Sequence, residues 1–282
     1  MQTLDSVEPL QTVIARWKSQ GHKMGLVPTM GDLHEGHLSL VRLAREKADR
    51  LVVSVFVNPL QFGPDEDFTR YPRQLESDAA LLEKAQVDLL FAPSVDAMYA
   101  KGRPAVQQVS AGEIGDILCG LSRPGHFDGV ATAVNRLFAV VQPDLAAFGQ
   151  KDYQQLLVIR RLVAEQGLAI DILGGSIARE ADGLAMSTRN RYLDEKARAV
   201  APRLFEELRA AAALIRSGTQ EHARILQRSI ENLTTAGFRP NYFELRRAVD
   251  LTVPSKKDRE LVLLAAAHLG ETRLIDNLLF SL

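Results

Sequence analysis

The chain has 282 residues, of which 46% are hydrophobic, and this length can bury one large core or two modest ones. Its 34 Lys plus Arg residues against 35 Asp plus Glu residues give a net charge of −1, so the composition indicates no basic surface for nucleic acid or an anionic membrane. The single cysteine, Cys119, excludes an internal disulfide, and no apolar run is long enough to span a bilayer. We therefore expect a cytoplasmic protein in which Cys119 packs in the interior rather than acting as a nucleophile.

Short β-branched runs alternate with amphipathic helical patterns through the first two thirds of the chain. This alternation predicts a parallel sheet with crossover helices. The nearly continuous apolar run at residues 51–57 indicates a sheet covered on both faces, so we expect a doubly wound, Rossmann-like α/β fold. The expected strands cover residues 24–28, 51–57, 87–91, 145–148 and 169–173, and the expected helices cover residues 38–48, 75–85, 130–141 and 153–166.

The pattern changes after Gly174-Gly175. A mostly helical stretch is expected over residues 196–233, followed by strands of a smaller sheet at residues 242–245, 261–267 and 272–277. We therefore expect two domains, residues 1–175 and a smaller α/β domain over residues 176–282, with a hinge near residues 174–176.

Residues 28–37 read PTMGDLHEGH and follow an apolar, strand-like stretch. We expect the strand to break at Pro28, the chain to turn through Gly31, and a helix to begin near Gly36. Backbone N–H groups and the imidazoles of His34 and His37 then meet at one helix N-terminus, where phosphates bind. A zinc motif would space its histidines at i and i+4, whereas these are at i and i+3 without an obvious third ligand; a plain helix cap with two surface histidines stays open.

A second polar segment, FVNPLQFG at residues 56–63, follows the expected strand at 51–57. Asn58 and Gln61 offer two neutral amides between apolar walls, which suits a small polar substrate. The alternative interpretation is an Asn-Pro turn with a solvated glutamine.

Two further segments carry phosphate chemistry. In FGQKDYQQ at 148–155, Lys151 can reach a phosphate as a point charge, and Asp152 can accept from ribose hydroxyls or cap the following helix. In DGLAMSTRN at 182–190, two hydroxyls and a guanidinium form a clamp for phosphate oxygens in a glycine-opened loop. Each of these two segments, taken alone, is also consistent with a surface helix cap or a surface loop.

Together with SRPGHFDG at 122–129, these segments resemble the pantothenate synthetase family, or pantoate–β-alanine ligases, of the HxGH nucleotidyltransferase-like superfamily. The resemblance runs from about residue 20 to the C-terminus. It implies ATP-dependent condensation of (R)-pantoate with β-alanine through a pantoyl-adenylate, releasing AMP and pyrophosphate, in pantothenate and coenzyme A biosynthesis. It also implies small-molecule partners, a homodimer, and a C-terminal lid domain over an ATP- and pantoate-binding catalytic domain.

The resemblance also implies roles for individual residues. His37, His34 and Lys151 are the catalytic residues. Gln61 and Gln155 bind pantoate, with Asn58 beside them, and Mg²⁺ bridges the triphosphate with Asp78 as its protein contact. The ATP site comprises Met30, Gly31, Asp32, Leu33, His34, Glu35, Gly36, His37, Gly149, Gln150, Lys151, Asp152, Ala178, Met186, Ser187, Thr188 and Arg189.

Three positions depart from the usual family pattern. Gln150 stands where Glu is usual, Thr188 where Ser is frequent, and Gly175-Ser176 where Val-Pro is frequent. None of them removes a side chain assigned to chemistry. The alternative enzyme is a nucleotidylyltransferase that keeps AMP on its product, which gives no reason for the paired glutamines. A catalytically inactive nucleotide sensor would require loss of Lys151 or His37, and both are present.

Overall fold

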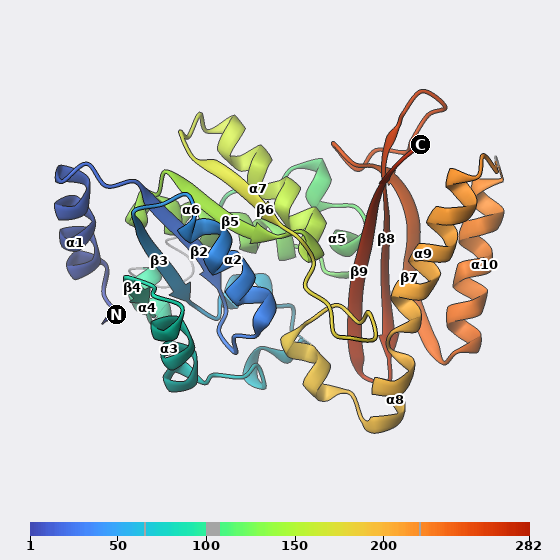
Figure 1. Cartoon of the computed structure of the whole chain (residues 1–282), viewed down its shortest axis with the longest axis horizontal. Helices are drawn as coiled ribbons and strands as arrows, with labels where there is room; N and C mark the ends of the chain where they lie inside the picture. The colour runs from blue at the N-terminus through green and yellow to red at the C-terminus, as the bar shows by residue number, and fades with distance from the viewer. Residues whose placement is uncertain (65, 100–107, 220) are drawn as a thin grey trace. The chain divides into compact units, whose positions relative to one another are not determined.

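The computed structural model describes residues 1–64, 66–99, 108–219 and 221–282 (Figure 1). The chain divides into two compact units, Met1–Gln150 with Gln155–Ser176, and Lys151–Gln154 with Ile177–Leu282. The four residues Lys151–Gln154 therefore group with the second unit, although the sequence on both sides of them belongs to the first. In the part of the chain that the structure describes, no helix is both long and apolar enough to cross a membrane.

The described residues of the first unit form a six-stranded parallel sheet in the order β1-β4-β3-β2-β5-β6. The chain order reverses between β2 and β5, since β3 and β4 lie on one side of this pair and β6 on the other. This is the topology of a doubly wound sheet and confirms the predicted fold class. The strands are β1 (Gln2–Leu4), β2 (Met24–Thr29), β3 (Arg50–Val55), β4 (Leu89–Phe91), β5 (Leu145–Gly149) and β6 (Asp171–Gly175).

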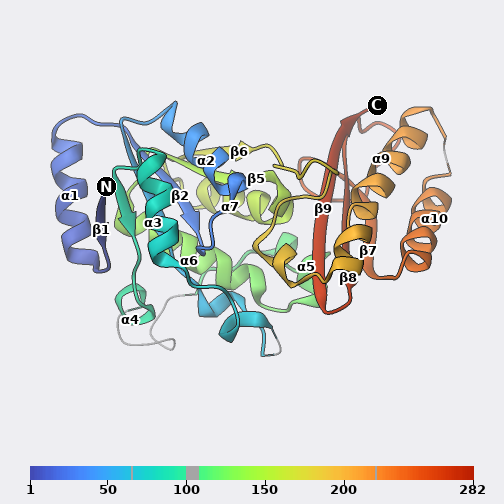
Figure 2. The ribbon, with the colours of Figure 1, turned by 60° about the horizontal axis from the view of Figure 1, so that its bottom comes forward.

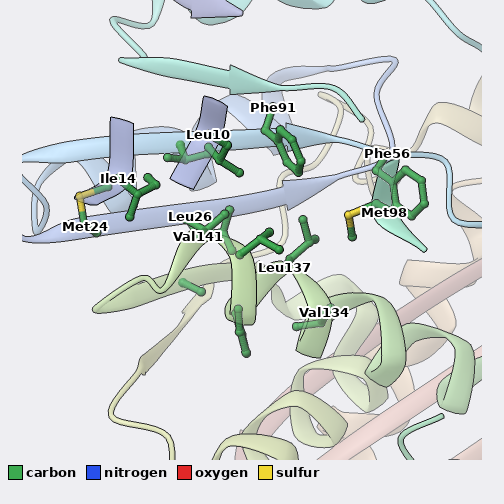
Figure 3. Close-up of a cluster of buried hydrophobic side chains, with 14 of the residues drawn as sticks. Leu10, Ile14, Met24, Leu26, Phe56, Phe91, Met98, Val134, Leu137 and Val141 are labelled. Atoms are coloured by element: carbon green, nitrogen blue, oxygen red, sulfur yellow. The ribbon is translucent and has the colours of Figure 1, made fainter. Parts of the chain in front are cut away.

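Helices cover both faces of this sheet because its side chains alternate between two apolar clusters. On β2, Met24 and Leu26 pack into the cluster with α1, α6 and α7, part of which Figure 3 shows, whereas Val27 packs into the cluster with α2 and α3. The helices are α1 (Val7–Ser19), α2 (Glu35–Arg45), α3 (Leu75–Lys84), α4 (Val95–Met98), α5 (Cys119–Ser122), α6 (His126–Val141) and α7 (Tyr153–Glu165). Short 3₁₀ turns are η1 (Pro59–Gln61), η2 (Asp67–Thr69), η4 (Glu113–Gly115) and η5 (Gln150–Asp152).

The second unit has an antiparallel sheet in the order β7-β8-β9, as expected for a smaller α/β domain. Leu261, Leu263 and Ala265 alternate along β8 and pack into one cluster with the helices that cover one face of the sheet (Figure 2). The elements are η6 (Thr188–Tyr192), α8 (Glu195–Val200), α9 (Arg203–Arg216), α10 (His222–Thr235), β7 (Phe238–Arg247), β8 (Glu260–Leu269) and β9 (Thr272–Ser281).

The predicted strand break at Pro28 is wrong. β2 continues through Pro28 to Thr29, and Pro28 pairs in register with Ser54 of β3. The pairing of β2 with β5 ends at Leu26, so at Pro28 only β3 lies beside the strand and the missing N–H interrupts no ladder on the other side. The chain then turns through Gly31, as predicted.

Candidate active site

The turn after β2 requires a glycine followed by a left-handed residue. Gly31 has φ +85° and Asp32 has φ +52°, a region that suits glycine and that aspartate tolerates. A Cβ atom on Gly31 would lie 2.9 Å from Asp78 Oδ2 and 3.0 Å from Val55 Cγ1. A larger residue at position 31 is therefore excluded without movement of its neighbours. The turn leads to His34, the N-cap residue of α2.

Asp78 holds this turn from the interior. Its Oδ2 accepts a hydrogen bond from Asp32 N at 2.9 Å, its Oδ1 accepts one from Leu33 N at 2.8 Å, and the residue is 1% exposed. Both oxygens of the predicted magnesium contact thus already bind loop amides. Among the described residues, no group of three His, Cys, Asp or Glu side chains is placed to hold a metal ion. The metal role of Asp78 stays a prediction, whereas its role as an anchor of the turn is observed.

His34 and His37 cap the N-terminus of α2 reciprocally. His34 Nδ1 accepts from Gly36 N at 3.1 Å, and His37 Nδ1 accepts from His34 N at 3.2 Å. The two ring centroids are 4.1 Å apart. Because Nδ1 is an acceptor in both rings, the neutral tautomer that this geometry assigns carries its proton on Nε2, which is then a donor. Two imidazole donors at the positive end of a helix suit phosphate oxygens.

The Gln61 side chain is oriented by its neighbours. Asn58 Nδ2 donates to Gln61 Oε1 at 3.1 Å, and Gln61 Nε2 donates to Met30 Sδ at 3.0 Å. Asn58 is held in turn, since its Nδ2 also donates to Gly129 O at 3.0 Å and its Oδ1 accepts from Tyr99 Oη at 2.8 Å. Gln61 is therefore not the solvated side chain of the alternative interpretation, and Met30 of the first predicted segment lies against Gln61 of the second.

The segment at residues 122–129 carries residues to which sequence reasoning assigned no role. Arg123 forms a bidentate ion pair with Glu66, with Nε and Nη2 at 2.7 and 2.6 Å from the carboxylate oxygens. His126 Nδ1 donates to the main-chain oxygen of Gln61 at 2.7 Å. These side chains fix the backbone of Gln61, as Asn58 fixes its amide. The motif SRPGHFDG was the signal that could have found them.

Gly129 and Tyr99 complete this arrangement. A Cβ atom on Gly129 would lie 2.1 Å from the main-chain oxygen of Leu60, so only glycine lets α6 approach η1 this closely. The glycine stands within the 122–129 motif. Tyr99, in contrast, has no sequence signal, because its contact with Asn58 joins residues 41 apart in the chain.

The segment after β5 divides between the two units. Gly149 ends β5, and the 3₁₀ turn η5 follows with Lys151 half-buried and Asp152 exposed. Gln155 is half-buried in the first turn of α7. Gly149 and Gln155 group with the first unit, whereas Lys151–Gln154 group with the second.

The loop that ends at η6 lies in the second unit and brings five of the predicted ATP-site residues together. Met186 N donates to Ala178 O at 2.9 Å, which closes the loop. Ser187 caps η6, its Oγ accepting from Arg189 N at 3.3 Å. Thr188, between them, is 8% exposed. Hydroxyl, backbone and guanidinium donors are thus grouped in one short segment, as a phosphate clamp requires.

β2 and β5 are neighbours where the strand order reverses, and the segments at residues 30–37 and 150–155 each begin where one of these strands ends. Open α/β sheets bind ligands beyond the carboxyl ends of their strands at this switch point. The fold, together with the HxGH motif (His34–His37) at the N-terminus of α2, therefore defines an α/β protein of the doubly wound, nucleotide-binding class.

The chain belongs to the pantoate-β-alanine ligase family, whose model matches residues 2–279, and is a ligase of that class. Pantothenate synthetase of Pseudomonas fluorescens strain Pf-5 is 50% identical over 278 residues, covering 99% of this chain and 97% of that protein. The crystal structure of pantothenate synthetase from Thermus thermophilus has a TM-score of 0.92 at 46% identity, covering 99% of both chains. The crystal structure of pantoate-β-alanine ligase from Francisella tularensis, complexed with beta-gamma ATP and β-alanine, has a TM-score of 0.84 at 32% identity. The match covers 99% of this chain and 97% of that chain. The resemblance stated from the motifs is confirmed.

Proposed function

We propose that this enzyme condenses (R)-pantoate with β-alanine in two ATP-driven steps, through a pantoyl-adenylate, and releases pyrophosphate and AMP in pantothenate and coenzyme A biosynthesis. The observation that carries the proposal is the contact between Met30 and Gln61. This contact joins the Gln61 amide to Met30, at the start of the turn that leads to His34 and His37. The family relationship and the Francisella tularensis complex with beta-gamma ATP and β-alanine support the choice of substrates.

The first step is attack of a pantoate carboxylate oxygen on the α-phosphorus of ATP. An oxygen–phosphorus bond forms, the bond to pyrophosphate breaks, and negative charge spreads over the phosphate oxygens. In our proposal the Nε2 groups of His34 and His37 donate hydrogen bonds to these oxygens, and the proton-donor role that the resemblance gives to His37 is this Nε2–H hydrogen bond, with no proton transferred. Lys151 neutralises charge at the α-phosphate. All three act through charge and hydrogen bonding, without a covalent intermediate on the protein.

The remaining ATP contacts follow the family assignment. Asp152 and Gly149 hold the ribose, and the backbone of Ala178 reads the adenine edge. Ser187, Thr188 and Arg189 close on the β- and γ-phosphates. The rest of the proposed site is Met30, Gly31, Asp32, Leu33, Glu35, Gly36, Gln150 and Met186. Gln150 and Thr188 keep a polar group where the family usually has Glu and Ser.

In the second step the amine of β-alanine attacks the acyl carbon of the mixed anhydride. An amide bond forms, the bond to AMP breaks, and the amine loses a proton. Gln61 and Gln155 hold the hydroxyls and the carboxylate of pantoate in this proposal, with Asn58 beside them. A guanidinium would bind the carboxylate of pantoate but would also lower its nucleophilicity. A neutral amide holds the acid with a smaller loss of nucleophilicity.

In our proposal Mg²⁺ would arrive with ATP and would neutralise triphosphate charge, with phosphate and water oxygens as most of its ligands. Asp78 stays the proposed protein contact, with anchoring of the turn as its larger role. We further propose a cytoplasmic homodimer that binds small molecules and no nucleic acid. In this proposal residues 1–175 form the catalytic domain and residues 176–282 a lid.

The test is release of pyrophosphate and AMP by the purified protein with Mg-ATP. Pantoate alone is expected to release pyrophosphate, up to about one equivalent per site, and AMP with the amide product should appear only after β-alanine is added. A nucleotidylyltransferase that keeps AMP on its product would release pyrophosphate without free AMP, whatever amine is present. Absence of pyrophosphate release with pantoate would contradict the substrate assignment.

A variant tests the role of the HxGH motif in the same assay. His37→Ala is expected to reduce the rate of pyrophosphate release by at least ~10²-fold, because it removes a preorganised donor to developing charge. His222→Ala, on α10, is the control and should leave the rate unchanged. A near-normal rate in His37→Ala would mean that the hydrogen-bond donor to the developing charge lies elsewhere.

A further inference from the structure

Two consecutive residues of β9, Asp276 and Asn277, bind two separate segments of the second unit. Asn277 Nδ2 donates to the main-chain oxygen of Lys151 at 2.9 Å across 126 residues of sequence, and Asn277 is 2% exposed. β9 pairs with β8 along its whole length, and Asn277 lies opposite Leu264 in that ladder (Figure 1). The anchor of Lys151 is therefore a paired strand rather than a loop.

Asp276 binds the other segment. Its Oδ2 and Oδ1 accept from Arg179 Nη1 at 2.6 Å and Nη2 at 2.9 Å, and Asp276 is 4% exposed. Burial raises the pKa of the Asp276 carboxyl, and the two hydrogen bonds from Arg179 oppose that rise. Arg179 also donates to Gly183 O at 3.0 Å and stacks on Phe205, its Cζ 3.4 Å from the ring centroid. One guanidinium thus ties a loop, a helix and β9 together.

Arg179 stands in the loop that leads to the phosphate clamp, residues 186–189. It forms an antiparallel bridge with Ala185, and Met186 N donates to Ala178 O. The loop is therefore closed upon itself at its base and fixed to β9 by Asp276. Asn277 follows Asp276 directly. Two adjacent residues of one strand therefore hold both Lys151 and the loop that carries the clamp.

We infer that Asn277 is a positioning residue, which holds Lys151 in register with the phosphate clamp so that both act as one rigid body. The grouping of Lys151–Gln154 with Ile177–Leu282 agrees with this inference. The inference rests on the proposed function, because it gives Lys151 and the clamp their phosphates. Loss of the Asn277 amide removes its hydrogen bond to the Lys151 carbonyl. The position of Lys151 relative to the clamp is then no longer fixed when the lysine approaches the α-phosphate.

Asn277→Ala is expected to lower the single-turnover rate of pyrophosphate release with pantoate and Mg-ATP by about tenfold, because a small misplacement of a charged group is costly in rate. The KM for pantoate should not change, since Gln61, Gln155 and Asn58 belong to the other unit. Asn232→Ala, which removes an exposed asparagine side chain from α10 of the same unit, is the control and should match the parent protein.

A double-mutant cycle separates positioning from a purely structural role. If Asn277 acts through Lys151, Asn277→Ala has no further effect on the rate in a Lys151→Ala background. An equal fold-loss in both backgrounds would overturn the inference, as would a raised KM for pantoate with an unchanged rate.

Where Asn277→Ala fails to fold, Asn277→Leu takes its place, since it keeps the approximate size of the side chain and removes the donor without burying a second carboxyl group beside Asp276. The same tenfold loss is expected, and a rate equal to that of the parent would overturn the inference. The parent protein separates this inference from the proposed function. Pantoate-dependent pyrophosphate release without coupling in the cycle overturns the inference alone, and no release from the parent overturns both.

Discussion

At the scale of single residues, the turn that precedes the HxGH motif (His34–His37) is held by Asp78, which lies 46 residues from Asp32 in the chain. Asp78 binds the amides of Asp32 and Leu33, and Gly31 is the residue that leaves room for its carboxylate. The left-handed φ of Asp32 is therefore held by a buried carboxyl group rather than by the turn alone. The helix N-terminus that carries His34 owes its position to this contact.

Asp78→Asn tests that dependence. An amide offers one oxygen acceptor where the turn needs two, so we expect kcat to fall about tenfold, or ~1.4 kcal/mol in activation free energy. The loss should persist at saturating magnesium. The measurement is a magnesium titration of steady-state rate, with Glu76→Gln, exposed in the first turn of the same helix, as the control. Recovery of the full rate at high magnesium would make metal binding the main role of Asp78 and contradict the anchor.

Residue types with a local signature could be predicted from the sequence. Gly31, His34 and His37 form one contiguous motif, and Gln61 follows a strand-like run directly. Tyr99 could not be found in this way, because a buried tyrosine beside Asn58 is indistinguishable in sequence from one that only fills the core.

At the scale of elements, the close approach of α6 to η1 positions Gln61, the residue proposed to bind pantoate. Gly129 lies within van der Waals contact of the Leu60 backbone, and its own carbonyl accepts from Asn58. The main-chain oxygen of Gln61 receives the His126 imidazole from the first turn of the same helix. One helix end thus orients both the backbone and, through Asn58, the side chain of Gln61.

Gly129→Ala is expected to push η1 away from α6, since its Cβ would meet a main-chain oxygen at 2.1 Å. Overpacking of this kind costs about 1–3 kcal/mol of stability. We also expect the KM for pantoate to rise about tenfold, ~1.4 kcal/mol in binding, with the Kd for ATP unchanged. Gly63→Ala is a matched control, because the nearest atom to its Cβ lies 3.7 Å away. Calorimetry and steady-state kinetics on both variants provide the check; equal weakening of ATP and pantoate binding would contradict the assignment of Gln61 to pantoate.

Periodicity predicts most of the helices and strands of the sheet, because fully buried strands and amphipathic helices have distinct apolar spacings. It does not predict β1, whose three residues are too few to show a period. The helix α1 is also missing from the predicted elements, although Leu10, Val13, Ile14 and Trp17 have helical spacing and are buried. Pro28 is predicted to end its strand, whereas the sheet tolerates it beyond the last pair of β2 with β5.

At the scale of the whole molecule, the grouping of Lys151–Gln154 with the second unit could not be derived from sequence order. Lys151–Gln154 group with the second unit through contacts such as that of Asn277 with Lys151, 126 residues apart. Local patterns do not report on pairs so distant in sequence. The family, in contrast, could be predicted at this scale, because the order of five motifs along one chain is much more specific than any single motif.

Folding stability is expected to depend on pH through His268. Burial, and then the charges of Arg273 and Arg239, lower the pKa of His268 below its ordinary value of 6.5, with Glu271 opposing them. The folded state therefore binds this proton less tightly than the unfolded state, so the contribution to stability is complete above 6.5 and is lost as the pH falls from there through the lowered pKa.

The check is the midpoint of thermal unfolding between about pH 5 and pH 7.5, the range that brackets the ordinary histidine pKa. His268→Gln should flatten the decline toward low pH, whereas His222→Gln, which removes a histidine from α10, should keep the parent slope. Parallel curves for the parent and His268→Gln would contradict the linkage.

The pantoyl-adenylate is the central intermediate of the proposed reaction. Pantoate labelled with ¹⁸O in its carboxylate should transfer one labelled oxygen to AMP when the reaction runs to completion with Mg-ATP and β-alanine, as mass spectrometry of the AMP would show. That result is expected because the carboxylate oxygen that attacks the α-phosphorus stays on AMP when the amine displaces it. Unlabelled AMP, or label in inorganic phosphate with formation of ADP, would contradict a pantoyl-adenylate.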